Sequence, residues 1–62
     1  MHMTNPFLEV GALVRHTQRE EWGTGQIQSM IGDRITVNFE NEGKVVLVGA
    51  SEQLQLVEAD VL

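Results

Sequence analysis

Few side chains in this sequence of 62 residues could act as acid–base catalysts or nucleophiles. It holds two histidines, His2 and His16, and no cysteine, so it has no thiol nucleophile, disulfide or thiolate zinc ligand. No serine and aspartate near His16 suggest a catalytic triad. Asp33, Glu40 and Glu42 fall in expected turns, where carboxylates bind local backbone amides or face solvent. We therefore expect no enzymatic activity, no cofactor and no metal site.

The composition narrows the class of protein further. With 42% hydrophobic and 21% charged residues, the chain is globular, and its length allows one small domain. Nine acidic and four basic residues give a net charge of −5. This charge disfavours nucleic-acid binding, which depends on lysine and arginine neutralising phosphates. Neither a membrane helix nor a signal peptide is recognisable, so we expect a cytoplasmic protein.

Alternating apolar and polar residues predict short β-strands rather than helices. We expect strands over residues 12–16, 23–31, 34–39, 44–48 and 53–57, although 52–62 would also tolerate a helical turn. Gly32-Asp33 is a two-residue hairpin turn, and a second reversal spans residues 40–43.

Four or five short strands in so small a chain require a strongly bent sheet, because a flat one would leave a face and its edges uncovered. We predict an all-β fold, a small five-stranded SH3-like barrel over residues 7–57. A flexible lead of residues 1–6, in which we interpret residues 1–2 as a cloning remnant, precedes it, and residues 58–62 form a tail. The expected core is Leu13, Ile27, Ile31, Ile35, Val37, Phe39, Val45, Leu47, Leu54 and Leu56.

The order of several residues resembles a known module. The landmarks are Gly11, Val14-Arg15-His16, Trp22-Gly23-Thr24-Gly25-Gln26-Ile27, Gly32, Val37-Asn38-Phe39, Gly43-Lys44, Leu47 and Leu54. They resemble the Tudor-like module at the C-terminal end of UvrD/PcrA-type DNA helicases. They are more similar still to a family of short, mostly uncharacterised bacterial proteins in which that module stands alone. More distantly, they resemble the RNA-polymerase-interacting domain of CarD and of the transcription-repair coupling factor.

This resemblance covers residues 11–57 and is most specific at the aromatic-Gly-x-Gly run from Trp22 to Gly25. It implies a Tudor-like, five-stranded barrel without a catalytic role. Because such modules in helicases and in the coupling factor bind RNA polymerase, it also implies RNA polymerase as a partner. It implies no particular interface residue.

Trp22 has two compatible interpretations. Its indole could cap the open end of the barrel, or it could anchor a partner, as tryptophan often does at interfaces. His16 could bond the backbone of the loop that follows it or contact the partner together with Arg19. A cage for methylated lysine or arginine is excluded, because Phe7, Trp22 and Phe39 are too few aromatic residues to build one.

The strand over residues 44–48 is apolar on both faces, so Val46 and Val48 should point away from the core. Either Phe7, Leu8 or Val61-Leu62 covers them, or they form an exposed strip for strand addition or a homodimer contact.

From these residues and the resemblance we expect a non-enzymatic protein-interaction module that binds RNA polymerase or a transcription/repair factor through a barrel face and an edge strand. Its binding surface combines Trp22, His16, Arg19, Val46 and Val48. One alternative is a weak nucleic-acid-binding protein that uses Arg15, Arg34 and Lys44, if these gather on one face. The other is a structural homo-oligomer that buries Val46 and Val48 against a second copy.

Overall fold

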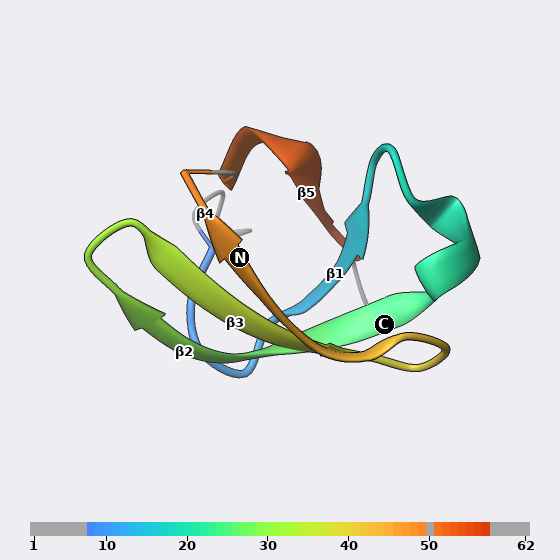
Figure 1. Cartoon of the computed structure of the whole chain (residues 1–62), viewed down its shortest axis with the longest axis horizontal. Coiled ribbons are helices and arrows are strands. Elements are labelled where there is room, and N and C mark those ends of the chain that lie inside the picture. Colours follow the sequence, from blue (N-terminus) through green and yellow to red (C-terminus); the bar gives the residue numbers. More distant parts are fainter. Residues whose placement is uncertain (1–7, 50, 58–62) are drawn as a thin grey trace, which may run out of the picture.

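The computed structural model describes residues 8–49 and 51–57, so the expectations for residues 1–6 and 58–62 lie outside it (Figure 1). Its strands are β1 (Leu13–His16), β2 (Thr24–Ile31), β3 (Arg34–Phe39), β4 (Gly43–Val48) and β5 (Leu54–Leu56). Two 3₁₀-helices, η1 (Glu20–Trp22) and η2 (Ser51–Gln53), precede β2 and β5.

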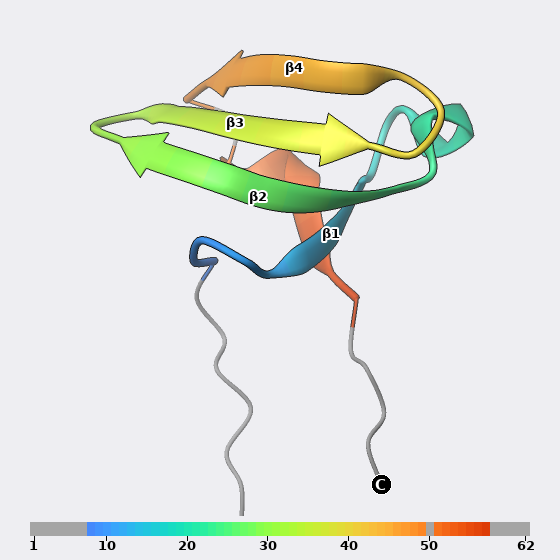
Figure 2. The ribbon, with the colours of Figure 1, turned by 90° about the horizontal axis from the view of Figure 1, so that it is seen from below.

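The five strands form one antiparallel sheet in the order β4-β3-β2-β1-β5. Strands β2, β3 and β4 lie side by side as one layer, and β1 and β5 cross beneath it (Figure 2). The five strands of this one strongly bent sheet confirm the predicted all-β class. No ladder joins β4 to β5 in the part of the chain that the structure describes, so each is an edge strand.

The β2–β3 hairpin closes through the predicted two-residue turn, because Ile31 pairs with Arg34. Gly32 has a φ of +59°, while no residue other than glycine has a positive φ among those described. A positive φ at the first central position only is the signature of a type II′ turn, which requires glycine there. Gly32-Asp33 is therefore in the order that this hairpin needs.

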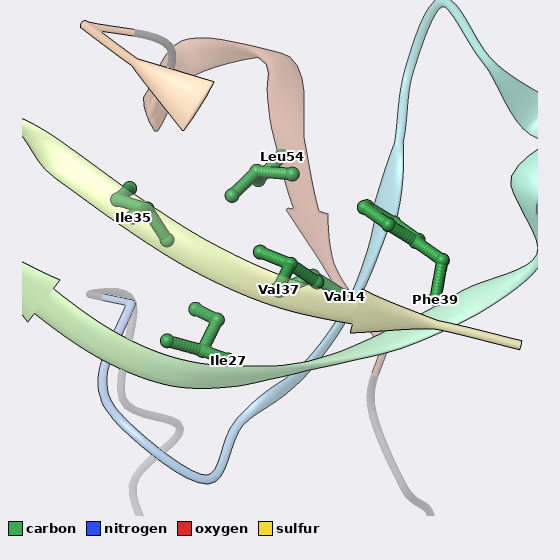
Figure 3. Close-up of a cluster of buried hydrophobic side chains, with 6 residues drawn as sticks. All are labelled: Val14, Ile27, Ile35, Val37, Phe39 and Leu54. Carbon is green, nitrogen blue, oxygen red and sulfur yellow. The ribbon is translucent and has the colours of Figure 1, made fainter. Parts of the chain in front are cut away.

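Six buried residues fill the space inside the bend: Val14, Ile27, Ile35, Val37, Phe39 and Leu54 (Figure 3). A ring of half-buried side chains packs against them: Leu8, Ala12, Trp22, Val45, Leu47 and Leu56. Eight of the ten predicted core residues belong to these two sets. The other two, Leu13 and Ile31, were wrong for different reasons.

In β1 the inward and outward positions are the reverse of those predicted. Leu13 is exposed, while Val14 is fully buried and His16 is nearly so. Alternation in a strand forces residues 13 and 15 to the same face. Burying Leu13 would therefore also have buried the charged Arg15, which costs far more than exposing a leucine.

In β2 a bulge reverses the alternation partway along the strand. Ile27 pairs with Val37, but Ser29 pairs with Thr36, so Gln28 is an extra residue without a partner on β3. An extra residue shifts every later side chain to the opposite face. Ile31 is consequently 72% exposed instead of buried.

Replacing Ile31 by serine should change the free energy of unfolding by no more than about 0.5 kcal/mol, because the side chain already faces solvent. Urea unfolding followed by Trp22 fluorescence would measure this. A loss above about 1.5 kcal/mol, typical of removing a buried aliphatic group, would contradict the bulged register.

Candidate functional site

Three rings pack together at one end of the sheet, and we call His16, Trp22 and Phe39 the ring cluster. The centroid of Trp22 lies 5.0 Å from that of His16, at an interplanar angle of 66°, and 5.1 Å from that of Phe39, at 56°. These are the tilted arrangements that aromatic pairs favour. Trp22 is half-buried, so it caps the core while part of its indole stays accessible.

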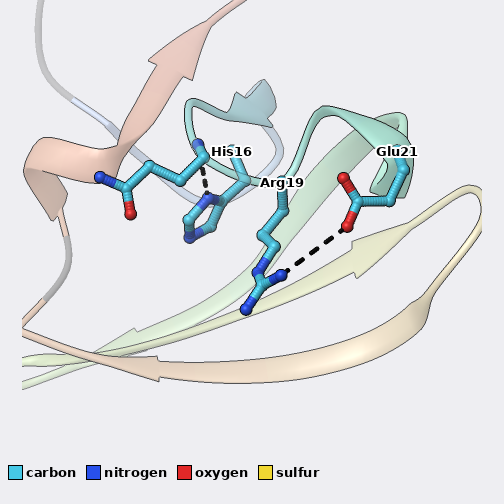
Figure 4. Close-up of polar contacts among 4 residues, drawn as sticks. His16, Arg19 and Glu21 are labelled. Carbon is cyan, nitrogen blue, oxygen red and sulfur yellow. Dashed lines mark hydrogen bonds and ion pairs between the residues drawn. The ribbon is translucent and has the colours of Figure 1, made fainter.

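His16 organises the loop that leads to Trp22. Its side chain is buried, and the backbone N–H of Gln18 donates a hydrogen bond of 3.1 Å to Nδ1 (Figure 4). A neutral imidazole that accepts at Nδ1 carries its proton on Nε2. The structure thus places His16 in the role of bonding the loop backbone rather than on an open surface.

Arg19 is the exposed member of this region. Its guanidinium carbon lies 5.8 Å from the centre of the Trp22 ring, and its Nη1 lies 3.9 Å from Oε2 of Glu21. Exposed ion pairs of this kind contribute at most about 1 kcal/mol. Arg19 therefore holds its position weakly and remains free to contact another molecule.

The last glycine of the aromatic-Gly-x-Gly run, Gly25, is required by close packing. A Cβ atom at this position would lie 2.5 Å from Cγ1 of Val37 and 2.7 Å from Cδ1 of Phe39. Only glycine leaves room for the Phe39 ring this close to β2, and Phe39 in turn packs against Trp22. The run that is most specific in the sequence therefore builds the packing under Trp22.

A second set of exposed side chains lies on the outer face of β2, β3 and β4. Ile31 is 72% exposed, Val48 is 62% and Val46 is 57%, and we call these three residues the edge patch. Ile31 pairs with Arg34, which pairs with Val48, so one row crosses all three strands. Leu8, predicted as a possible cover for Val46 and Val48, instead packs against the core, while Phe7, Val61 and Leu62 lie outside the described residues.

The outer edge of β4 runs directly beside Val46 and Val48, the two members of the edge patch on that strand. The N–H of Gly49 donates to the carbonyl of Asp33 at 2.8 Å, which fixes the phase of hydrogen bonding between β3 and β4. Bonded pairs alternate along an antiparallel ladder, so residues 43, 45 and 47 bond to β3. Lys44, Val46 and Val48 direct their main-chain groups outward, and these have no β-ladder partner among residues 8–49 and 51–57.

Acidic side chains are confined to turns, loops and 3₁₀-helices among the described residues, whereas three of the four basic residues lie in strands. The seven acidic residues that the structure describes all lie in turns, loops and 3₁₀-helices: Glu9, Glu20, Glu21, Asp33, Glu40, Glu42 and Glu52. Arg15, Arg34 and Lys44 instead lie in strands and are exposed. The outer face of the sheet is thus basic and apolar in a chain whose net charge is −5.

The structure does not gather Arg15, Arg34 and Lys44 into one cluster. Arg34 pairs with Val48 at one end of β4, while Lys44 lies near the other end, opposite Asn38. Arg15 lies on β1, which β2 separates from β3. Compact contact with a phosphate by all three bases is not available in this arrangement.

The five predicted partner-binding residues fall into two places. His16, Trp22 and Arg19 lie at the ring cluster, whereas Val46 and Val48 lie on β4. Sequence reasoning missed Ile31 as a member of the outer face, since no local signal marks the bulge that exposes it. The segregation of charge could have been anticipated, because no acidic residue falls within any of the segments expected to be strands.

Among the described residues, no group of three or more histidine, cysteine or acidic side chains is placed to hold a metal ion. None of the helices in this part of the chain is long and apolar enough to cross a lipid bilayer.

Residues 8–57 match the model of a family described as "Protein of unknown function (DUF3553)", so the chain belongs to this family. The expected likeness to a small, uncharacterised domain is confirmed to that extent. No curated protein and no solved structure matched the chain. The resemblance to the helicase, CarD and coupling-factor modules stays a prediction.

Proposed function

We propose that this protein is a non-enzymatic interaction module that binds an extended segment of a partner protein beside β4. The observation that carries the proposal is that β4 has an edge without a ladder partner among the described residues and exposes Val46 and Val48 on the same strand. In strand addition, main-chain hydrogen bonds supply affinity, and alternate side chains supply specificity. Val46 and Val48 offer apolar area to those alternate side chains.

The partner to test first is RNA polymerase, which the Tudor-like resemblance implies. The ring cluster supports the interaction indirectly, because it fixes the end of β3 at Phe39 and so the strand against which β4 pairs. Arg19 and the accessible edge of Trp22 offer a second, smaller contact. Nucleic-acid binding is the weaker candidate, since the three bases assigned to it lie apart on different strands.

The proposal predicts that Val46→Glu reduces capture of the partner from a bacterial lysate by about tenfold or more. The substitution removes apolar area from the centre of the contact. The new carboxylate would also have to be desolvated there without an ionic partner. Val10→Glu is the matched control, because Val10 is 60% exposed and lies outside the strands. If Val46→Glu and Val10→Glu captured every protein equally, RNA polymerase subunits included, the proposal would be contradicted.

A proline at position 46 separates main-chain from side-chain recognition. The N–H of Val46 points away from β3, so proline there removes no hydrogen bond of the sheet, as edge strands tolerate. It does remove a donor that an added strand needs. Val46→Pro should therefore weaken capture while the protein stays folded by circular dichroism.

A further inference from the structure

The edge beside β4 has a chemical preference that follows from the residues along it, and it rests on the proposed function. We propose that the partner segment is an extended strand that carries a carboxylate opposite Lys44 and apolar side chains opposite Val46 and Val48. Its alternating pattern is acidic-x-apolar-x-apolar in one chain direction and the reverse in the other.

The geometry of β4 sets the spacing of this pattern. Lys44, Val46 and Val48 point their side chains to the outer face and their main-chain groups to the free edge. A strand added at this edge places every second side chain beside one of these three residues, on the same face. The intervening side chains of the added strand fall on the face of Val45 and Leu47.

The charge on this face sets the identity of the polar residue. No acidic residue lies in any described strand, and Lys44 is exposed on the strand at the edge. A carboxylate beside Lys44 gains a cross-strand ion pair, whereas a lysine there would meet a like charge. Arg34 is exposed on β3 next to Val48, at the opposite end of β4 from Lys44, so it does not contribute to the acidic position.

The two turns that flank β4 set the limits of the acidic position. Glu42 precedes the strand, and Asp33 lies beside Gly49 just after it, whereas the Glu40 carboxylate is turned toward β2 and accepts a hydrogen bond from the N–H of Thr24. A carboxylate displaced beyond either end of β4 would approach Glu42 or Asp33 and be repelled. An acidic residue is favoured within the strand, beside Lys44, and this fixes the register of the added segment.

Synthetic peptides test this preference with the full chain. Each peptide has roughly nine residues, the length of one strand, with glutamate, valine and valine at three alternate positions and threonine elsewhere. A second peptide has lysine in place of glutamate, and both are also made in the reversed order. Fluorescence anisotropy gives the affinities, and the backbone amide shifts of Lys44, Val46 and Val48 in NMR spectra locate the contact.

We expect the glutamate peptide, in one of the two orders, to bind at least about fivefold more tightly than its lysine counterpart and to shift the amides of β4. Lys44→Glu should reverse this preference. Arg15→Glu makes the same change of charge on β1 and should leave it unchanged. Reversal by Arg15→Glu as well would show a general charge effect and would overturn the register.

The remaining outcomes separate this inference from the function on which it rests. Equal binding of both peptides at β4, with loss in Val46→Glu, would overturn the acidic preference and leave the interaction module standing. Binding of neither peptide would overturn the inference, while capture from lysate judges the proposed function by itself. Self-association through β4, seen as a dimer in sedimentation that Val46→Glu dissociates, would assign the edge to a second copy and overturn the inference.

Discussion

Gly25→Ala should lower the free energy of unfolding by about 3 kcal/mol, which is most of what a core of this size supplies. The added methyl group would meet Cγ1 of Val37 at 2.5 Å and the ring of Phe39 at 2.7 and 2.9 Å. Both neighbours are buried, so neither can move aside without disturbing the core. Urea unfolding followed by circular dichroism and Trp22 fluorescence measures the loss.

Two controls separate crowding from backbone strain. Gly11 has a φ of +95°, and a methyl group added there would meet nothing within 4 Å, so Gly11→Ala should cost only about 1 kcal/mol. Adding Phe39→Leu to Gly25→Ala should cost less than the sum of the two single changes, because the smaller side chain makes room. Strict additivity of the two would contradict the role given to Phe39.

His16→Ala should lower the free energy of unfolding by about 2 to 3 kcal/mol. It leaves the N–H of Gln18 without its acceptor at 3.1 Å and removes the ring that lies against Trp22. The indole should then become more accessible, which acrylamide quenching of Trp22 fluorescence would detect.

Two conservative variants divide this loss between its causes. His16→Asn keeps an acceptor near the position of Nδ1 but has no ring, and it should recover about 1 kcal/mol. His16→Phe keeps a ring but no acceptor, and it should restore protection of Trp22 from quenching. If His16→Asn were as unstable as His16→Ala, the hydrogen bond from Gln18 would contribute nothing to stability.

The strands could be predicted because their signals are local. Alternation and the Gly32-Asp33 turn lie within each hairpin, and they placed β2, β3 and β4 to within a residue or two. The two wrong core predictions show where local sequence signals are no longer sufficient. The position of Leu13 was decided by the cost of burying Arg15, and that of Ile31 by a bulge that exists only in the pairing of β2 with β3.

The candidate site divides in the same way. Exposure of Val46 and Val48 could be predicted, because this strand is apolar on both faces and only one of them can pack against the core. Strand addition at an edge strand is expected from the sequence, but that β4 and β5 are the two edges could not be predicted, because this depends on which strands pair across the bend. A packing role for Trp22 could be predicted from the glycines beside it. Its contact with His16 could not, because that contact depends on how β1 and η1 are arranged in space.

The open edge of β4 also has a consequence for solubility. The strand reads Gly-Lys-Val-Val-Leu-Val, a short run with a high tendency to form β-structure, no proline and a single charge. Runs of this composition on an exposed edge are the ones that nucleate sheet-to-sheet aggregation. Lys44 is the only charged residue in β4 that opposes it. The same lysine that we assign to partner selection thus also opposes pairing between the β4 edges of two copies of the chain.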